Sequence, residues 1–313
     1  MDKNNPTEKL YNLEIIKEIS KGHFGILYKA RTCDKKIVAL KVIKNSDHHA
    51  VENSKKELFV YSNLPSHPNI LKCLGYAEKN DRFLILFEYL DNKDLWEYFF
   101  KDPNKKLSDK KIAQYIWQLC DALQFLHKHN IIHADVKLEN ILIDNKDQIR
   151  LCDFGLSDIR SKDYNSEYRR GICGTIGYIA PEIYKDEIAN VTPYIDVWAV
   201  GVVLYELLYH KSPFVSSANN DECRKTDGSM DRKILYQIMT TFPSLPTDID
   251  DDLLDLFQQI FETEPRYRIS LDDIKRHKWM KKTIKNETIK NETIKTPSKI
   301  PFKNPFKTPF KTP

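Results

Sequence analysis

The sequence predicts an α+β fold in which strands come first along the chain and helices follow. Three early segments, at 13–19, 38–41 and 82–87, have the apolar, β-rich character of strands. Later, Ser108 to Asn130 places apolar residues at helical spacing behind a polar start, which is typical of an amphipathic helix. The length of 313 residues is ample for one large domain or two lobes.

Composition indicates a reducing compartment. The six cysteines are scattered without a Cys-x-x-Cys pair, which argues against a disulfide or zinc framework. The N-terminus is polar, so we expect no signal peptide, and the most apolar segment, 195–208, is too short to span a bilayer. We therefore expect a cytoplasmic or nuclear protein. The body of the chain is slightly acidic, so nothing in it suggests a nucleic-acid surface.

One stretch, His133 to Gly155, organises the chain. It opens with polar residues, continues through two β-rich pieces at 141–143 and 149–151 that flank a polar turn, and closes with an acidic residue. A hairpin formed by the two pieces would bring the polar residues at its two ends together.

Four polar residues of this stretch suit the transfer of a phosphoryl group from a nucleotide. The reaction needs the γ-phosphate, a metal ion and an acceptor hydroxyl held in line, with their charge neutralised. Asp135 could accept the hydroxyl proton, and Lys137 could lie against the γ-phosphate. Asn140 and Asp153 present hard oxygen ligands, which suit Mg²⁺. A lone Asp or Asn is usually a turn former, but the recurrence of these residues at the required spacing favours catalysis.

The motifs His-x-Asp-x-Lys-x-x-Asn and Asp-Phe-Gly resemble the catalytic core of a eukaryotic-type protein kinase. The resemblance implies a two-lobed kinase fold, with a small, mainly antiparallel β lobe that carries one key helix and a larger α-helical lobe. It also implies that ATP and Mg²⁺ are the cofactors. The implied boundaries are an N-terminal extension at 1–12, a kinase domain at 13–280 (small lobe 13–90, large lobe 91–280) and a tail at 281–313.

The small lobe contains the expected nucleotide-binding residues. Ser20-x-Gly22-x-x-Gly25 resembles the kinase Gly-rich loop, whose backbone N–H groups approach phosphates, with Ser20 in place of the first glycine. The resemblance assigns the hinge backbone of Glu88, Tyr89 and Leu90 to adenine. It further assigns Phe87 to the back of the pocket, Asp94 to the ribose, and the apolar walls to Ile19, Leu27, Ala39 and Leu142.

Lys41 lies in an apolar strand, where its ammonium needs a partner. The kinase pattern supplies two partners, the α/β-phosphates and a glutamate on a helix. Glu57 is the best match for that glutamate and Glu52 is the second choice; without the motif, either would be taken for an exposed residue on a solvated helix face.

The segment from Asp153 to Glu182 resembles an activation segment. Lys137 after Asp135, together with Thr175 before Tyr178, resembles the serine/threonine-specific kinases, which makes Thr175 a catalytic residue by resemblance. Candidate phosphorylation sites in the segment are Ser161, Tyr164, Ser166 and Tyr168.

Two departures bear on regulation. Ala134 stands where most kinases have an arginine that binds a phosphorylated activation-loop residue, and Gly171 stands where many relatives carry the phosphorylated threonine. We therefore expect that phosphorylation of this loop is not the main switch.

Two further matches are structural. Asp196 should hold the backbone of the His133 loop, and Arg268 should pair with Glu182.

The sequence thus predicts an ATP-dependent kinase that phosphorylates serine and threonine hydroxyls of protein substrates, in a motif style similar to the calmodulin-dependent-kinase-like group. One alternative is a catalytically impaired scaffold, which the presence of all the catalytic residues argues against. A small-molecule kinase is the other, and the segment from Gly174 to Glu182, built to receive a peptide, disfavours it. Asp94 and Glu139 are candidates for recognising basic residues before the acceptor.

The tail, residues 281–313, carries nine lysines and two glutamates in short repeats and is expected to be disordered. Its lysines and interleaved phenylalanines could tether the protein weakly to an acidic membrane surface or to an acidic partner, including nucleic acid. An inert low-complexity extension is an equally good interpretation.

Overall fold

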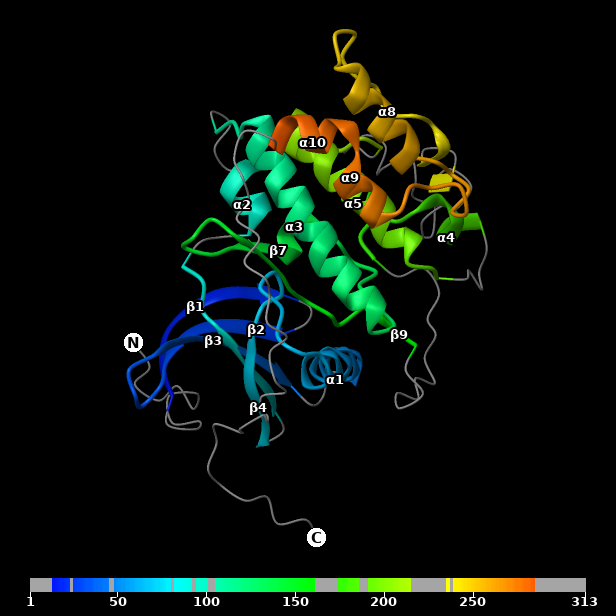
Figure 1. Ribbon diagram of the computed structural model, residues 1–313. Coiled ribbons are helices and arrows are strands. Elements are labelled where there is room, and N and C mark those ends of the chain that lie inside the picture. Colours follow the sequence, from blue (N-terminus) through cyan, green and yellow to red (C-terminus); the bar gives the residue numbers. More distant parts are fainter. Residues whose placement is uncertain are drawn as a thin grey trace, which may run out of the picture.

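The predicted order of strands before helices is present in the fold. The computed structural model describes residues 13–22, 25–44, 48–79, 82–91, 94–100, 105–160, 174–185, 191–214, 235–236 and 239–284. Figure 1 shows the strands of a small lobe, drawn in blue and cyan, below a larger lobe of helices. The candidate phosphorylation sites, Gly171 and the tail beyond Ile284 lie outside the described residues.

The small lobe is one five-stranded antiparallel sheet in the order β1-β2-β3-β5-β4. Residues alternate along β3: Val38, Leu40 and Val42 join one apolar cluster, whereas Ala39 and Ile43 join the main core that continues into the large lobe. Helix α1 contacts β3 and β5. The bounds are β1 (Glu14–Gly22), β2 (Gly25–Arg31), β3 (Ile37–Lys44), α1 (His48–Asn63), β4 (Cys73–Lys79) and β5 (Arg82–Glu88).

The large lobe is built around two buried helices. Helix α3 begins after Ser108, whose hydroxyl accepts a hydrogen bond from the backbone N–H of Lys111, as its polar start predicts. Helix α5 is apolar on all sides and buried along most of its length. The bounds are α2 (Leu95–Phe100), α3 (Asp109–Lys128), α4 (Pro181–Lys185), α5 (Tyr194–Tyr209), α8 (Asp251–Ile260), α9 (Leu271–Arg276) and α10 (Lys278–Ile284).

Short strands present the catalytic stretch between the lobes. The predicted hairpin is confirmed, because β7 (Ile141–Ile143) pairs antiparallel with β8 (Ile149–Leu151). It follows a short 3₁₀ helix, η1 (Leu138–Asn140). Strand β6 (Ile131–Ile132) pairs with β9 (Asp158–Ile159), so the chain before the catalytic loop lies beside the chain that follows Asp-Phe-Gly.

Two buried polar anchors fix these loops, and both were predicted. The carboxylate of Asp196 accepts the backbone N–H groups of His133 (3.0 Å) and Ala134 (2.9 Å) and contacts His127 Nε2 (2.7 Å). Burial alone would raise the pKa of Asp196, but its hydrogen bonds to His127 and to the backbone N–H of Ala134 help to lower it. Arg268 forms a bidentate pair with Glu182, at 2.7 and 2.9 Å.

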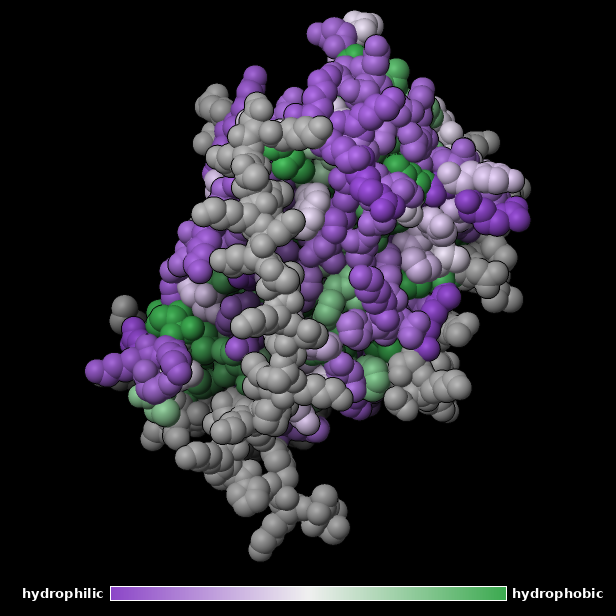
Figure 2. Space-filling model, viewed as in Figure 1, coloured by the Kyte–Doolittle hydropathy of each residue, from purple (hydrophilic) through white to green (hydrophobic). Residues whose placement is uncertain are grey.

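The face seen in Figure 2 is mainly hydrophilic over the helices of the large lobe. Among the described residues, none of the helices has both the length and the apolar character needed to cross a membrane.

Candidate active site

Three residues predicted to act in catalysis, from two separate loops, meet at Asp135. Thr175 Oγ1 donates to Asp135 Oδ1 at 2.8 Å, and Lys137 Nζ donates to Thr175 Oγ1 at the same distance. Lys137 Nζ also lies 3.1 Å from Asp135 Oδ2. The carboxylate of Asp135 is therefore held at both oxygens, by residues from two separate loops.

Asn140 and Asp153 lie at the two ends of the β7–β8 hairpin. The amide nitrogen of Asn140 donates to the carbonyl oxygen of Asp135 at 2.8 Å and to its carboxylate at 3.0 Å, so the amide oxygen remains for a cation. Asp153 has a left-handed backbone (φ 64°), which an acidic or amide residue tolerates better than most, and its side chain is 33% exposed. Both can therefore present oxygen to a hard cation.

Lys41 is partnered by Glu57 rather than Glu52. Its ammonium lies 2.7 Å from Glu57 Oε2 and 3.9 Å from Asp153 Oδ1, whereas Glu52 pairs with Lys55 on the surface of α1. Burial by itself would lower the pKa of Lys41, but the two carboxylates outweigh it and raise that pKa. Lys41 therefore stays cationic beside the carboxyl groups of Glu57 and Asp153.

A row of aromatic contacts supports this arrangement and was not foreseen. Tyr61, one turn beyond Glu57 on α1, packs edge-to-face against Phe87 (5.4 Å between ring centres) and Phe154 (4.9 Å). Phe154 in turn packs against His133 at 5.3 Å. The position of α1 is thereby coupled to the Asp-Phe-Gly segment.

Four of the expected nucleotide-contacting residues, Leu27, Ala39, Phe87 and Leu142, belong to or pack against the core that the two lobes share. Phe87 is buried and lies opposite Ala39 in the β3–β5 register, whereas Leu27 and Leu142 are half-buried. Ile19, the fourth wall residue with Ala39, Leu27 and Leu142, is 42% exposed.

Asp94 has a use that the sequence did not reveal. Its carboxylate accepts the backbone N–H of Glu97 at 2.7 Å, which caps the start of α2. Burial raises its pKa. A half-buried capping carboxylate is a weaker candidate for binding a basic peptide than a free one.

Glycine suits the two positions of the Gly-rich loop for different physical reasons. A Cβ added to Gly22 would meet no heavy atom within 4 Å, so open space lies beside it. Gly25 has a φ of +117°, and an added Cβ would lie 2.5 Å from the carbonyl oxygen of Val42. Ser20 is an ordinary exposed residue of β1 that pairs with Leu27, so the strand tolerates its side chain.

A buried carboxyl beside Tyr178 was not assigned a role from the sequence. Glu206, on α5, is 7% exposed and accepts a hydrogen bond from the hydroxyl of Tyr178 at 2.5 Å. Burial raises the pKa of Glu206 to about 8; the bond from Tyr178 lowers it, and the charge of Glu139 raises it. The available signal was a glutamate inside an apolar helix, because burying a charged group costs free energy unless the group is paired or neutralised.

Comparison with known proteins decides the family. The Protein kinase domain family matches residues 13–280. The chain belongs to the protein kinase family. This kinase is 32% identical over 286 residues to an Aurora kinase of Eremothecium gossypii, which covers 88% of the chain and 72% of the relative. It is 33% identical to an Aurora kinase of Saccharomyces cerevisiae, over 87% of the chain and 70% of the relative.

A third relative, an Aurora kinase of Schizosaccharomyces pombe, is 32% identical over 86% of the chain and 71% of its own length. These relatives do not support the expected similarity to the calmodulin-dependent-kinase-like group. The chain is a serine/threonine protein kinase, a class of enzyme that uses ATP and Mg²⁺ and acts on protein substrates.

Proposed function

We propose that Asp135, Lys137, Thr175, Asn140 and Asp153 carry out phosphoryl transfer in this kinase. The observation that carries the proposal is their convergence: Asp135 is bonded by Thr175, Lys137 and Asn140, and Asp153 reaches Lys41 from the other end of the hairpin. Asp135 would accept the proton of the substrate hydroxyl, with Thr175 keeping its carboxylate in orientation. Lys137 would lie against the transferred phosphoryl group.

The donor set fits Mg²⁺, with Asn140 and Asp153 as its ligands. A carboxylate and an amide oxygen are hard donors, and Mg²⁺ is usually held by one or two such groups together with phosphate oxygens and water. Bound Mg²⁺ supplies neutralisation of the phosphate charge. Lys41, fixed by Glu57, adds a second positive charge on the phosphate side.

The remaining nucleotide contacts follow from the small lobe. The backbone at Ser20, Gly22 and Gly25 would cover the phosphates, and the open space beside Gly22 supports that close approach. The hinge residues Glu88 and Leu90 would bond adenine through their backbone groups. Phe87 would close the back of the pocket, Asp94 would reach the ribose with its remaining oxygen, and the walls would be Ile19, Leu27, Ala39 and Leu142.

The protein substrates are proposed to carry arginine shortly before the acceptor. Glu139 and Glu206 place two carboxyl groups beside Tyr178, three residues beyond Thr175, and their charges interact. Paired carboxylates suit a guanidinium. Asp94, which the sequence also suggested for this role, caps α2 with one oxygen and is proposed to reach the ribose with the other, so we propose Glu206 as the partner of Glu139.

A degenerate peptide library tests activity and preference together. Phosphorylation of serine and threonine peptides with arginine enriched just before the acceptor is the expected result. A library with no enrichment of basic residues at those positions would reject the carboxyl pair as the recognition element while leaving the kinase activity standing.

We also propose a location in a reducing compartment and a binding role for the tail. Cys33, Cys73, Cys120 and Cys152 carry free thiols, which supports a cytoplasmic or nuclear location. The lysine-rich tail is proposed to bind acidic membrane surface or an acidic partner, on the strength of its charge alone.

A further inference from the structure

The connection between α1 and β4 belongs to the small lobe in sequence but is bonded to the large lobe. The backbone N–H of Leu151, in β8, donates to the carbonyl of Asn69, and the N–H of Leu71 donates to the carbonyl of Leu151, both at 2.9 Å. The side chain of Asn69 adds bonds to the carbonyl of Ile149 (3.1 Å) and to Gln118 on α3 (3.0 Å). This connection must therefore move with the large lobe.

The hinge is fastened to the same connection through Glu88. The backbone N–H of Glu88 donates to the carbonyl of Lys72 at 3.0 Å, and its carboxylate accepts the N–H of Lys72 at 2.9 Å. Glu88 is also the last residue of β5, where the chain leaves the sheet. Glu88 therefore stands where the chain passes from the sheet toward the large lobe.

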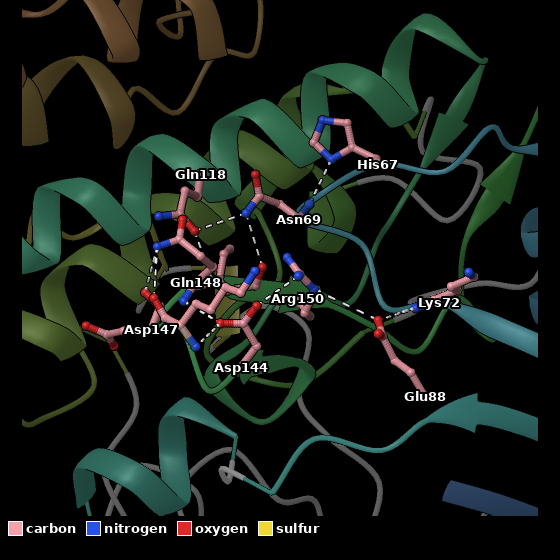
Figure 3. A network of polar contacts seen from close by, with 11 residues as sticks. His67, Asn69, Lys72, Glu88, Gln118, Asp144, Asp147, Gln148 and Arg150 are labelled. Atoms are coloured by element: carbon pink, nitrogen blue, oxygen red, sulfur yellow. Dashed lines mark hydrogen bonds and ion pairs between the residues drawn. The ribbon is translucent and has the colours of Figure 1, made fainter. Parts of the chain in front are cut away.

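Arg150 of the large lobe faces the same carboxylate (Figure 3). Its Nε lies 3.9 Å from Glu88 Oε1, and its terminal nitrogen donates to Asp144 Oδ2 at 2.8 Å. Asp144 is itself fixed, because its other oxygen accepts the backbone N–H groups of Lys146 and Gln148, both at 2.9 Å. Asp144 therefore holds the guanidinium group of Arg150 in position beside Glu88.

The same hairpin carries a wall of the proposed nucleotide site. Arg150 lies directly opposite Leu142 in the β7–β8 register, and the carboxylate and guanidinium side chains are only 31% and 20% exposed. We propose that Glu88, Arg150 and Asp144 form a hinge latch, which slows the opening of the two lobes and thereby slows the release of nucleotide. The latch rests on the proposed nucleotide site.

The expected effect of the latch on nucleotide release follows from the geometry of the Glu88–Arg150 ion pair. A partly exposed ion pair at 3.9 Å that has no direct hydrogen bond is a weak contact. Its loss should speed nucleotide release by about two- to fivefold. The substitution Glu88→Gln keeps an oxygen for the N–H of Lys72 and removes only the charge facing Arg150, so it isolates the ion pair.

The test measures dissociation of a fluorescent ADP analogue by stopped flow in the presence of Mg²⁺. Arg150→Gln and Glu88→Gln should each speed dissociation two- to fivefold, and the double variant should be no faster than the quicker single variant, because both remove one contact. Arg150→Lys should restore most of the slow rate. Arg31→Gln breaks a partly exposed Arg–Glu pair within the small lobe and should leave the rate unchanged.

Wild-type dissociation in Arg150→Gln, or additive effects in the double variant, would overturn the latch. Hydrogen exchange without nucleotide gives an independent reading: the amide of Lys72 should exchange faster in Arg150→Gln, and unchanged exchange there would also reject it. Failure of every form, wild type included, to bind the ADP analogue would instead contradict the proposed nucleotide site, and the exchange result would still decide the latch.

Discussion

Replacing Glu206 with glutamine should stabilise the protein while weakening its choice of substrate. A carboxyl whose pKa is about 8 in the folded chain and 4.5 in the unfolded chain costs stability as the pH rises above 4.5, and the cost stops growing above 8. Each pH unit in that window adds about 1.4 kcal/mol. Glutamine is uncharged throughout and can still accept the hydrogen bond from Tyr178.

The advantage of Glu206→Gln in the free energy of unfolding should therefore grow from about 1 kcal/mol at pH 5 to about 4 kcal/mol at pH 8. Urea denaturation of both proteins at several pH values measures it. Glu139→Gln is the matched control, because Glu139 is exposed and its charge should change stability far less. An advantage that does not vary with pH would show that Glu206 does not stay neutral in the folded protein.

The same carboxyl must ionise before it can bind a guanidinium. With a pKa of about 8, roughly a tenth of Glu206 is ionised at pH 7, so the KM for arginine-containing peptides should fall about tenfold by pH 9. A peptide with glutamine in place of that arginine corrects for other titrating groups. If Glu206→Gln keeps the wild-type preference for arginine, the recognition pocket has been placed wrongly.

The other predictions concern regulation and the tail. Because Ala134 offers no guanidinium, phosphatase-treated protein made in bacteria should already be active; a rise of about 10²-fold in kcat/KM on phosphorylation within 161–173, about 2.7 kcal/mol, would contradict this. A chain ending at Ile284 should match the full-length protein in peptide kinetics and lose salt-sensitive binding to anionic vesicles. No vesicle or polyanion binding by the full-length protein at low salt would refute the tether.

Much of the fold follows from local patterns. The hairpin at 141–151 was predictable because two short β-rich pieces flank a polar turn, and the start of α3 was predictable because Ser108 is a strong capping residue. Helix α10 shows the limit of such reasoning. It continues to Ile284, and Lys282 pairs with Asp250, a contact that spacing alone does not reveal.

The parts of the site that were missed depend on contacts between distant segments. Tyr61 gains its role from Phe87 and Phe154, and the capping role of Asp94 depends on where α2 begins. The importance of Glu206 could have been inferred from the sequence. A buried acid in an apolar helix needs a partner, and the same argument identified Lys41.

Asp153→Asn tests the assignment of the catalytic residues most directly. Asparagine tolerates the left-handed backbone at this position and keeps the side-chain shape, so the melting temperature should stay near that of the wild type. Loss of the metal-binding charge should lower kcat/KM on a peptide substrate by at least about 10²-fold, whereas the exposed Asp272→Asn on α9 should be unaffected. A folded Asp153→Asn protein with near-normal turnover would contradict the account of this active site.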